Sequence, residues 1–215
     1  MIRIAAALIA LTIYPLSALA ESGQKTYDLL FRTGTLDTME SAQTLLYSRD
    51  VMNLLKPDAA QRDTGDIALF LRPENPDEAM LEFRQQEKSR RLGKFPASVG
   101  NPMIMLFYEK TIRDMAEAAG GSPFYIRNRV KEALVQPSTV ELGEATVNGT
   151  TVPTKTIRLY PFQDDPNADR MKGFGDLELT VTMSEDVPGW YMQLTASAGG
   201  IYRSDVTFTK LEDAQ

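Results

Sequence analysis

The chain has 215 residues, with 29 acidic against 23 basic side chains and neither histidine nor cysteine. The lack of imidazole and thiol groups excludes the common zinc sites, the Ser-His-Asp triad, Cys-His catalysis and His-ligated haem. The acidic balance argues against nucleic acid as a partner, because phosphates require a basic surface. An enzyme built from this chain would have to rely on carboxylates, lysine, tyrosine, serine or arginine.

Residues 1–20 have the layout of a secretory signal peptide. Arg3 gives a positive start, residues 4–13 are apolar, and residues 17–20 place small side chains where a signal peptidase reads them. The apolar run is too short to cross a bilayer, which takes about 20 residues. We therefore expect removal of residues 1–20 on export and a single β-rich domain over residues 21–215. That domain is expected to be periplasmic or extracellular and not membrane-spanning.

The first half of the domain is expected to be mostly strands. Residues 27–33 suggest a short helix, and the period of the apolar residues then changes to two. Apolar and polar residues alternate over 45–51, 67–71 and 81–83, and residues 91–97 add a further segment broken by a proline. This alternation predicts half-buried antiparallel strands.

Two helices are expected in the middle of the chain. Asn101-Pro102 is a helix start, residues 103–119 contain no glycine or proline, and Gly120-Gly121 is a stop. A second helix is predicted over 123–135, so that residues 101–135 form a helical hairpin. The charges of the first helix are spaced for i,i+4 ion pairs between Glu109 and Arg113, Lys110 and Asp114, and Arg113 and Glu117.

Strands return after Pro137. Asn148-Gly149 between β-branched runs is a strong hairpin pattern. Alternation over 177–183 and 190–197, and again around Val206 and Phe208, predicts the closing strands. The sequence thus predicts the α+β class, with a curved, mostly antiparallel sheet of about eight or nine strands. This open half-barrel would wrap around the central helical hairpin.

An apolar ligand site is expected between this sheet and the first helix. Methionine lines adaptable binding surfaces, and several of the ten methionines fall in the helix and the late strands. The predicted pocket wall consists of Met103, Leu106, Phe107, Trp190, Met192 and Leu194. We expect no catalytic residue, metal or cofactor. The acidic segment 164–176 has the spacing of half a calcium loop, but Arg170 stands where that loop needs glycine.

The charged residues leave two alternatives open. Basic side chains cluster on residues 88–94 and again on 127–131, where they could meet anionic lipid or a partner protein, although a solvated face explains them as well. A carboxylate-based hydrolase would need two acids roughly 5–9.5 Å apart across a cleft. Glu82, Glu141 and Glu178 are the acids considered for that role, but they lie in predicted strands and are expected on the solvent-exposed face.

The order of the elements resembles that of the periplasmic lipoprotein-carrier half-barrels. A signal peptide, a short helix, a strand block, a helical pair and a second strand block follow one another in both. Members of that family curl an open antiparallel sheet around helices that act as a lid over an apolar pocket. The resemblance covers most of residues 21–215 and carries over no functional residue. Residues 100–134 are also similar to a stretch of uncharacterised secreted bacterial proteins.

We therefore expect a secreted periplasmic, non-enzymatic binding or carrier protein for an apolar or lipid-like ligand. The alternative is a protein-interaction or structural module of the cell envelope, and a carboxylate-based hydrolase comes third.

Overall fold

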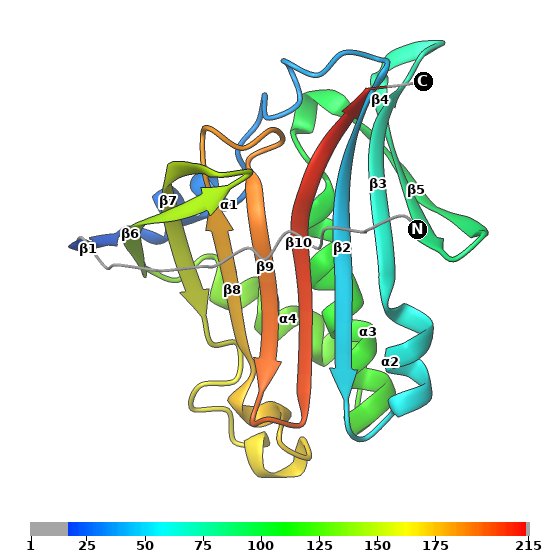
Figure 1. Ribbon diagram of the computed structural model, residues 1–215. Coiled ribbons are helices and arrows are strands. Elements are labelled where there is room, and N and C mark those ends of the chain that lie inside the picture. Colours follow the sequence, from blue (N-terminus) through cyan, green and yellow to red (C-terminus); the bar gives the residue numbers. More distant parts are fainter. Residues whose placement is uncertain (1–16, 214–215) are drawn as a thin grey trace.

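The described part of the chain, residues 17–213 in a computed structural model, is built on one ten-stranded sheet (Figure 1). The strand order from edge to edge is β1-β6-β7-β8-β9-β10-β2-β3-β4-β5, and all neighbours are antiparallel. The strands are β1 (Ser17–Glu21), β2 (Gln43–Asn53), β3 (Gly65–Arg72), β4 (Asn75–Gln85), β5 (Lys88–Pro96), β6 (Ser138–Val147), β7 (Thr150–Leu159), β8 (Glu178–Met183), β9 (Tyr191–Ala198) and β10 (Tyr202–Asp213).

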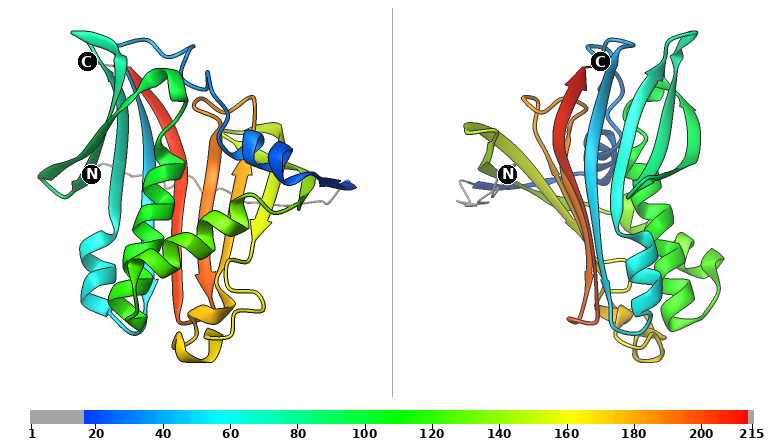
Figure 2. Two further views of the ribbon diagram at one scale, coloured as in Figure 1. Left: turned by 180° about the vertical axis from the view of Figure 1, so that it is seen from behind. Right: turned by 45° about the vertical axis from the view of Figure 1, so that its right-hand side comes forward.

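The predicted α+β class with an open, curved antiparallel sheet is confirmed. Figure 2 shows the sheet bending around helices that lie on one of its faces. The described strands exceed the expected number by one, because residues 17–21 form β1 at the edge beside β6. Of the predicted signal peptide, residues 1–16 lie outside the described residues and the last four belong to β1.

The described helices are α1 (Gly23–Leu30), α2 (Pro57–Asp63), α3 (Met103–Ala119) and α4 (Pro123–Leu134), with short 3₁₀ turns η1 (Ala97–Val99), η2 (Ala168–Arg170) and η3 (Phe174–Asp176). The prediction for α3 is confirmed at its end and is one residue early at its start, because Pro102, expected as the first helical residue, is the N-cap. The prediction for α4 is confirmed within one residue. The predicted start of α1 at residue 27 is wrong, because the helix begins at Gly23 after its N-cap residue Ser22. The short helix α2 was not predicted.

The two central helices do not run side by side as a tight hairpin. Gly120 and Gly121 have φ angles of 81° and 94°, a region that glycine enters without steric cost. After this turn α4 leaves α3 and crosses the face of the sheet, whereas α3 runs along the strands (Figure 2). Among the described residues no helix has both the length and the apolar character needed to cross a membrane.

The core lies between the helices and the covered face of the sheet. Alternate residues of the central strands point into it, as the period-two pattern requires. In β9 the inward residues are Met192, Leu194, Ala196 and Ala198, all buried. The β6–β7 hairpin turns at Asn148-Gly149, where both residues have positive φ (51° and 81°), as a type I′ turn demands.

Candidate functional site

The predicted pocket wall lies in the packed interface between α3 and the sheet. Met103, Phe107 and Leu194 are buried in the core, and Leu106 packs against it from its edge. None of these four residues lines the surface grooves described below, so in this arrangement their side chains form part of the packed core.

Trp190 and Met192 belong to the same buried core, but each also borders a surface hollow. The Trp190 indole donates a hydrogen bond to the Leu29 carbonyl over 3.2 Å, and the Arg32 guanidinium lies 4.6 Å from the ring centroid. Trp190 has a φ of 77°, which is unusual for an aromatic residue, and it borders a groove of about 470 Å³. Met192 is buried but borders a smaller groove of about 230 Å³. The structure therefore places all six predicted residues in or against one core, and two of them also border separate surface hollows.

The start of α3 is fixed to the sheet by the buried side chain of Asn101. Its amide nitrogen donates to the Tyr47 hydroxyl over 2.9 Å and to the Gly189 carbonyl over 2.8 Å. Its amide oxygen accepts from the backbone N–H of Met103 over 2.9 Å. One side chain thus satisfies the first N–H group of the helix, from the position before the N-cap residue Pro102, and joins the helix to β2 and to the β8–β9 turn. We call Tyr47, Asn101 and Gly189 the Asn101 clamp.

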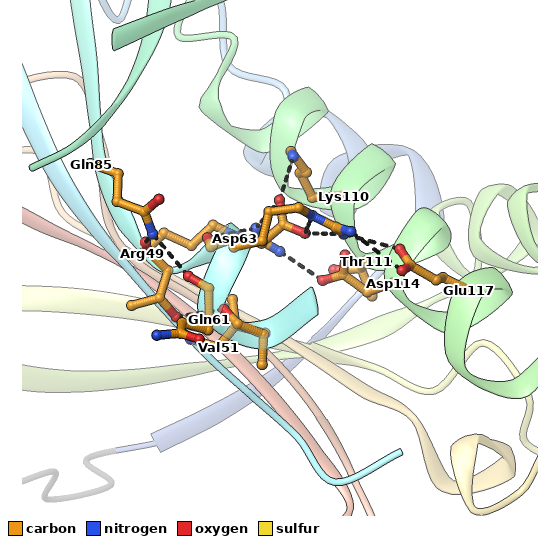
Figure 3. A network of polar contacts seen from close by, with 12 residues as sticks. Arg49, Val51, Gln61, Asp63, Gln85, Lys110, Thr111, Asp114 and Glu117 are labelled. Atoms are coloured by element: carbon orange, nitrogen blue, oxygen red, sulfur yellow. Dashed lines mark hydrogen bonds and ion pairs between the residues drawn. The ribbon is translucent and has the colours of Figure 1, made fainter. Parts of the chain in front are cut away.

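The second half of α3 is held by buried charges. Arg49 on β2 donates to the Asp114 carboxylate of α3 over 2.7 Å and to the Asp63 carbonyl of α2 over 3.0 Å (Figure 3). The Tyr202 hydroxyl of β10 donates to the same Asp114 oxygen over 2.8 Å. Lys110 of α3 pairs with the Asp63 carboxylate at 3.1 Å. These five residues form the Arg49 network, which joins α2 and α3 to two central strands.

The pKa values of the two carboxyl groups in the Arg49 network, Asp114 and Asp63, are shifted in opposite directions. Burial raises the pKa of Asp114, and the facing Arg49 charge and the Tyr202 hydrogen bond only partly oppose this. Burial would also raise the pKa of Asp63, but the hydrogen bond from Arg62 and the charges of Lys110 and Arg49 outweigh it and lower that pKa. Burial lowers the pKa of Lys110 despite its Asp63 partner.

The Arg49 network replaces the intrahelical ion pairs that the sequence suggested. Lys110 pairs with Asp63 rather than with Asp114, and Asp114 pairs with Arg49. The other charges of α3 behave alike, since Glu109 pairs with Arg127 of α4 and Glu117 with Arg62 of α2. Helical spacing shows only that two charges are able to meet, whereas buried partners on other elements offer stronger contacts.

Sequence reasoning missed Arg49, although the strand pattern contains a clue. Arg49 occupies the same alternation phase as Leu45, Tyr47 and Val51, so it had to point inward with them. A buried arginine requires a carboxylate partner, and Asp114 lies within the buried stripe of α3. The identity of that partner depends on which helix covers β2, which the strand pattern does not encode.

Along α3 between Asn101 and Asp114, the buried hydroxyls are those of Tyr108 and Thr111, and Thr111 donates to the Phe107 carbonyl over 3.0 Å. The Tyr108 hydroxyl is buried and has no hydrogen-bond partner among the described residues. Burial raises its pKa strongly. An unpaired buried hydroxyl costs about 1–3 kcal/mol. The buried face of α3 thus includes one energetically unfavourable group between the Asn101 clamp and the Arg49 network.

A polar groove of about 780 Å³ lies where α4 meets the strands near the β6 edge. Arg158 of β7 pairs there with Glu141 of β6 and, at 3.5 Å, with Glu178 of β8. Two of the acids considered for a hydrolase thus converge, whereas Glu82 lies on β4 and pairs with Arg84. Arg158 fills the space between Glu141 and Glu178, where a scissile bond would have to lie.

The basic clusters and the acidic segment have local partners. Lys94 pairs with Glu78, Arg127 with Glu109, and Arg129 with Glu132. Asp165 is buried, accepts hydrogen bonds from the Tyr125 hydroxyl, and lies 2.9 Å from Arg129. Within residues 17–213 no group of three or more acidic side chains is placed to hold a metal ion.

Comparison with known proteins identifies no family for this chain. No protein-family model matches the chain, and a search of curated proteins finds no match.

Proposed function

We propose that this chain is an exported envelope protein that binds or carries an apolar or lipid-like ligand between the sheet and its helical cover. The observation that supports this most is the construction of the α3 interface. A broad apolar contact is held by the Asn101 clamp at one end and the Arg49 network at the other, and the Tyr108 hydroxyl is buried unpaired between them.

In this proposal the observed arrangement is the unliganded, closed one. The closed interface is filled by side chains such as Phe107 and Leu194, so a ligand enters only when α3 moves away from β9. Movement exposes the Tyr108 hydroxyl to water and removes its penalty, which offsets part of the cost of separating the apolar surfaces. The resemblance of the element order to lipoprotein-carrier half-barrels supports the same arrangement of sheet, cover and cargo.

The absence of cysteine makes a direct test possible, because one introduced thiol is then unique. In a Leu194→Cys variant the thiol lies beneath α3, whereas in Met105→Cys it lies on the exposed side of the helix, where Met105 is 49 % exposed. We expect phosphatidylglycerol vesicles to accelerate maleimide labelling of Leu194→Cys and to leave that of Met105→Cys unchanged. Mass spectrometry of organic extracts should also detect lipid co-purifying with the unmodified protein.

The proposal is abandoned if no lipid co-purifies, no fluorescent apolar dye binds, and Leu194→Cys stays protected at the rate set by global unfolding. The unfolding rate is measured separately in urea, which separates opening of the cover from loss of the whole fold.

A second candidate function, a protein-interaction module, is favoured by the edges of the sheet. The β5 edge carries Lys88, Arg90 and Arg91, all exposed, and charge of this kind discourages pairing with other chains. The opposite edge strand is β1, which among the described residues covers the side of β6 that faces away from β7. If residues 1–20 are removed as predicted, β6 loses that partner and offers free backbone groups to an extended segment. A pull-down from envelope extract, with and without a competing peptide of residues 17–21, tests this candidate.

A further inference from the structure

We call the polar groove beside α4 the seam groove. It is accessible from the surface in this structure, whereas the interface between α3 and the sheet is filled by side chains. It has a volume of about 780 Å³ and is lined by the end of α4, β6, the end of β7, the loop that follows, and the start of β8. Its lining is mostly polar, with side chains including Gln136, Ser138, Thr139 and Gln163. A hollow of this size and polarity suits a hydrophilic ligand of one or more rings.

Three half-buried side chains form a fixed row along one wall of the groove. Arg158 lies between Glu141 and Glu178, and the Thr180 hydroxyl donates to Glu178 over 2.8 Å. The exposed fraction is 31 % for the Arg158 side chain, 34 % for Glu141 and 33 % for Glu178. Each of the three therefore keeps part of its hydrogen-bonding capacity free. Guanidinium groups only donate and carboxylates only accept. A hydroxyl does both, so adjacent hydroxyls of a sugar ring match this alternation of donors and acceptors.

Tyr160 adds an aromatic surface beside the row. It follows β7 directly, lines the groove and is 48 % exposed. Burial raises the pKa of its phenol, and the nearby Glu178 carboxylate adds to that rise. An exposed aromatic ring with a polar end provides an apolar face for the C–H side of a sugar and a hydrogen-bonding group at its rim.

The charges of the groove argue against an ionic ligand. Its lining contains two arginines, Arg129 and Arg158, against the four carboxylates of Glu132, Glu141, Asp164 and Glu178. A phosphate or carboxylate ligand would meet this acidic surplus, and each arginine already has carboxylate partners. Three of the four carboxylates already pair with an arginine, so at every one except Asp164 a cation would have to displace an arginine. A neutral ligand meets neither obstacle.

We propose that the seam groove binds a neutral, polyhydroxylated ligand, namely the sugar rings of an oligosaccharide or of a glycolipid headgroup. The hydroxyls pair with the Glu141–Arg158–Glu178 row, and a ring face stacks on Tyr160. This site does not depend on the proposed apolar cavity, because the groove is accessible without movement of α3.

Neutral oligosaccharides on a glycan array and a neutral glycolipid, diglucosyldiacylglycerol in phosphatidylcholine vesicles, are the probes. We expect array sugars to bind and Tyr160→Ala and Arg158→Ala each to weaken that binding by about tenfold or more. Two matched controls should change it by less than about twofold. Phe124→Ala removes a 75 % exposed aromatic ring of α4 outside the groove, and Arg203→Ala breaks a surface Arg–Asp pair on β10.

The outcomes separate the two sources of the sugar. Binding of free oligosaccharide assigns the groove to glycans, and binding of glycolipid vesicles alone, lost in Tyr160→Ala, assigns it to a headgroup. The proposal is overturned if neither probe binds, or if Tyr160→Ala and Arg158→Ala bind as well as the two controls. Sugar binding in a protein that co-purifies with no lipid, binds no apolar dye and keeps Leu194→Cys protected would support the groove proposal and reject the apolar-ligand proposal.

Discussion

Replacing Arg49 by methionine tests whether the Arg49 network holds α3 against the sheet. The substitution removes the donors that lie 2.7 Å from Asp114 and 3.0 Å from the Asp63 carbonyl. The Asp114 carboxylate then stays buried with the Tyr202 hydroxyl as its remaining donor. Removing one partner of a buried ion pair costs about 3–5 kcal/mol, since the other charge is left uncompensated. We expect a loss of that size in the free energy of unfolding at neutral pH.

The pH dependence of the loss has a definite sign. Burial already raises the pKa of Asp114 in the folded protein, and removal of the facing Arg49 charge raises it further. A carboxyl with a raised folded-state pKa destabilises the fold where it is ionised, above its ordinary pKa, and this penalty disappears as the pH falls and the group takes up a proton. The difference between Arg49→Met and the unmodified protein should therefore shrink in acid.

Urea unfolding followed by the fluorescence of Trp190, the single tryptophan and a buried one, provides the measurement. The double variant Arg49→Met/Asp114→Leu should recover most of the loss, because no buried charge then lacks its partner. Arg203→Met, which breaks an exposed ion pair, should cost less than about 1 kcal/mol. A loss for Arg49→Met no larger than that control, or one that grows in acid, would refute the reasoning.

Further substitutions test the neighbouring features by the same urea assay. Tyr108→Phe removes a buried, unpaired hydroxyl and should leave stability unchanged or raise it by about 1 kcal/mol, whereas Tyr47→Phe breaks a hydrogen bond and should cost about 1 kcal/mol. The reverse order would contradict the description of this interface. Gly189→Ala should cost about 1–3 kcal/mol, since φ is 78° and the new Cβ would lie 2.5 Å from a buried leucine methyl group. Gly120→Ala has a similar φ of 81° but open space around it, and should cost less, about 1 kcal/mol. In Asp63→Asn, the free energy of unfolding should fall less steeply on acidification than in the unmodified protein. A carboxyl with a lowered pKa stabilises the fold above its ordinary pKa and ceases to do so as the pH falls. An unchanged dependence of stability on acid pH would contradict the role assigned to Asp63.

Local pattern was enough for the elements whose apolar period is clear. Helix 103–119 begins one residue after the predicted start and ends at Gly120, as predicted, because capping and chain-breaking residues act on their immediate neighbours. The hairpin at Asn148-Gly149 is equally local. The short helix α2 has only seven residues, too few to show a period, and its contacts with β2 support it in the fold.

The sequence by itself determined the strands with clear alternation, the central helices and the absence of histidine- and cysteine-based chemistry. Alternation and capping are properties of neighbouring residues, and composition is a property of the whole chain. Only the tertiary structure decided which charges meet. Arg49 pairs with Asp114 because β10 pairs with β2 and α3 packs over the covered face of these strands. Arg158 pairs with Glu141 and Glu178 because β6, β7 and β8 are adjacent. These partners are set by strand order and helix placement, which depend on burying apolar surface over the whole chain rather than on any local spacing.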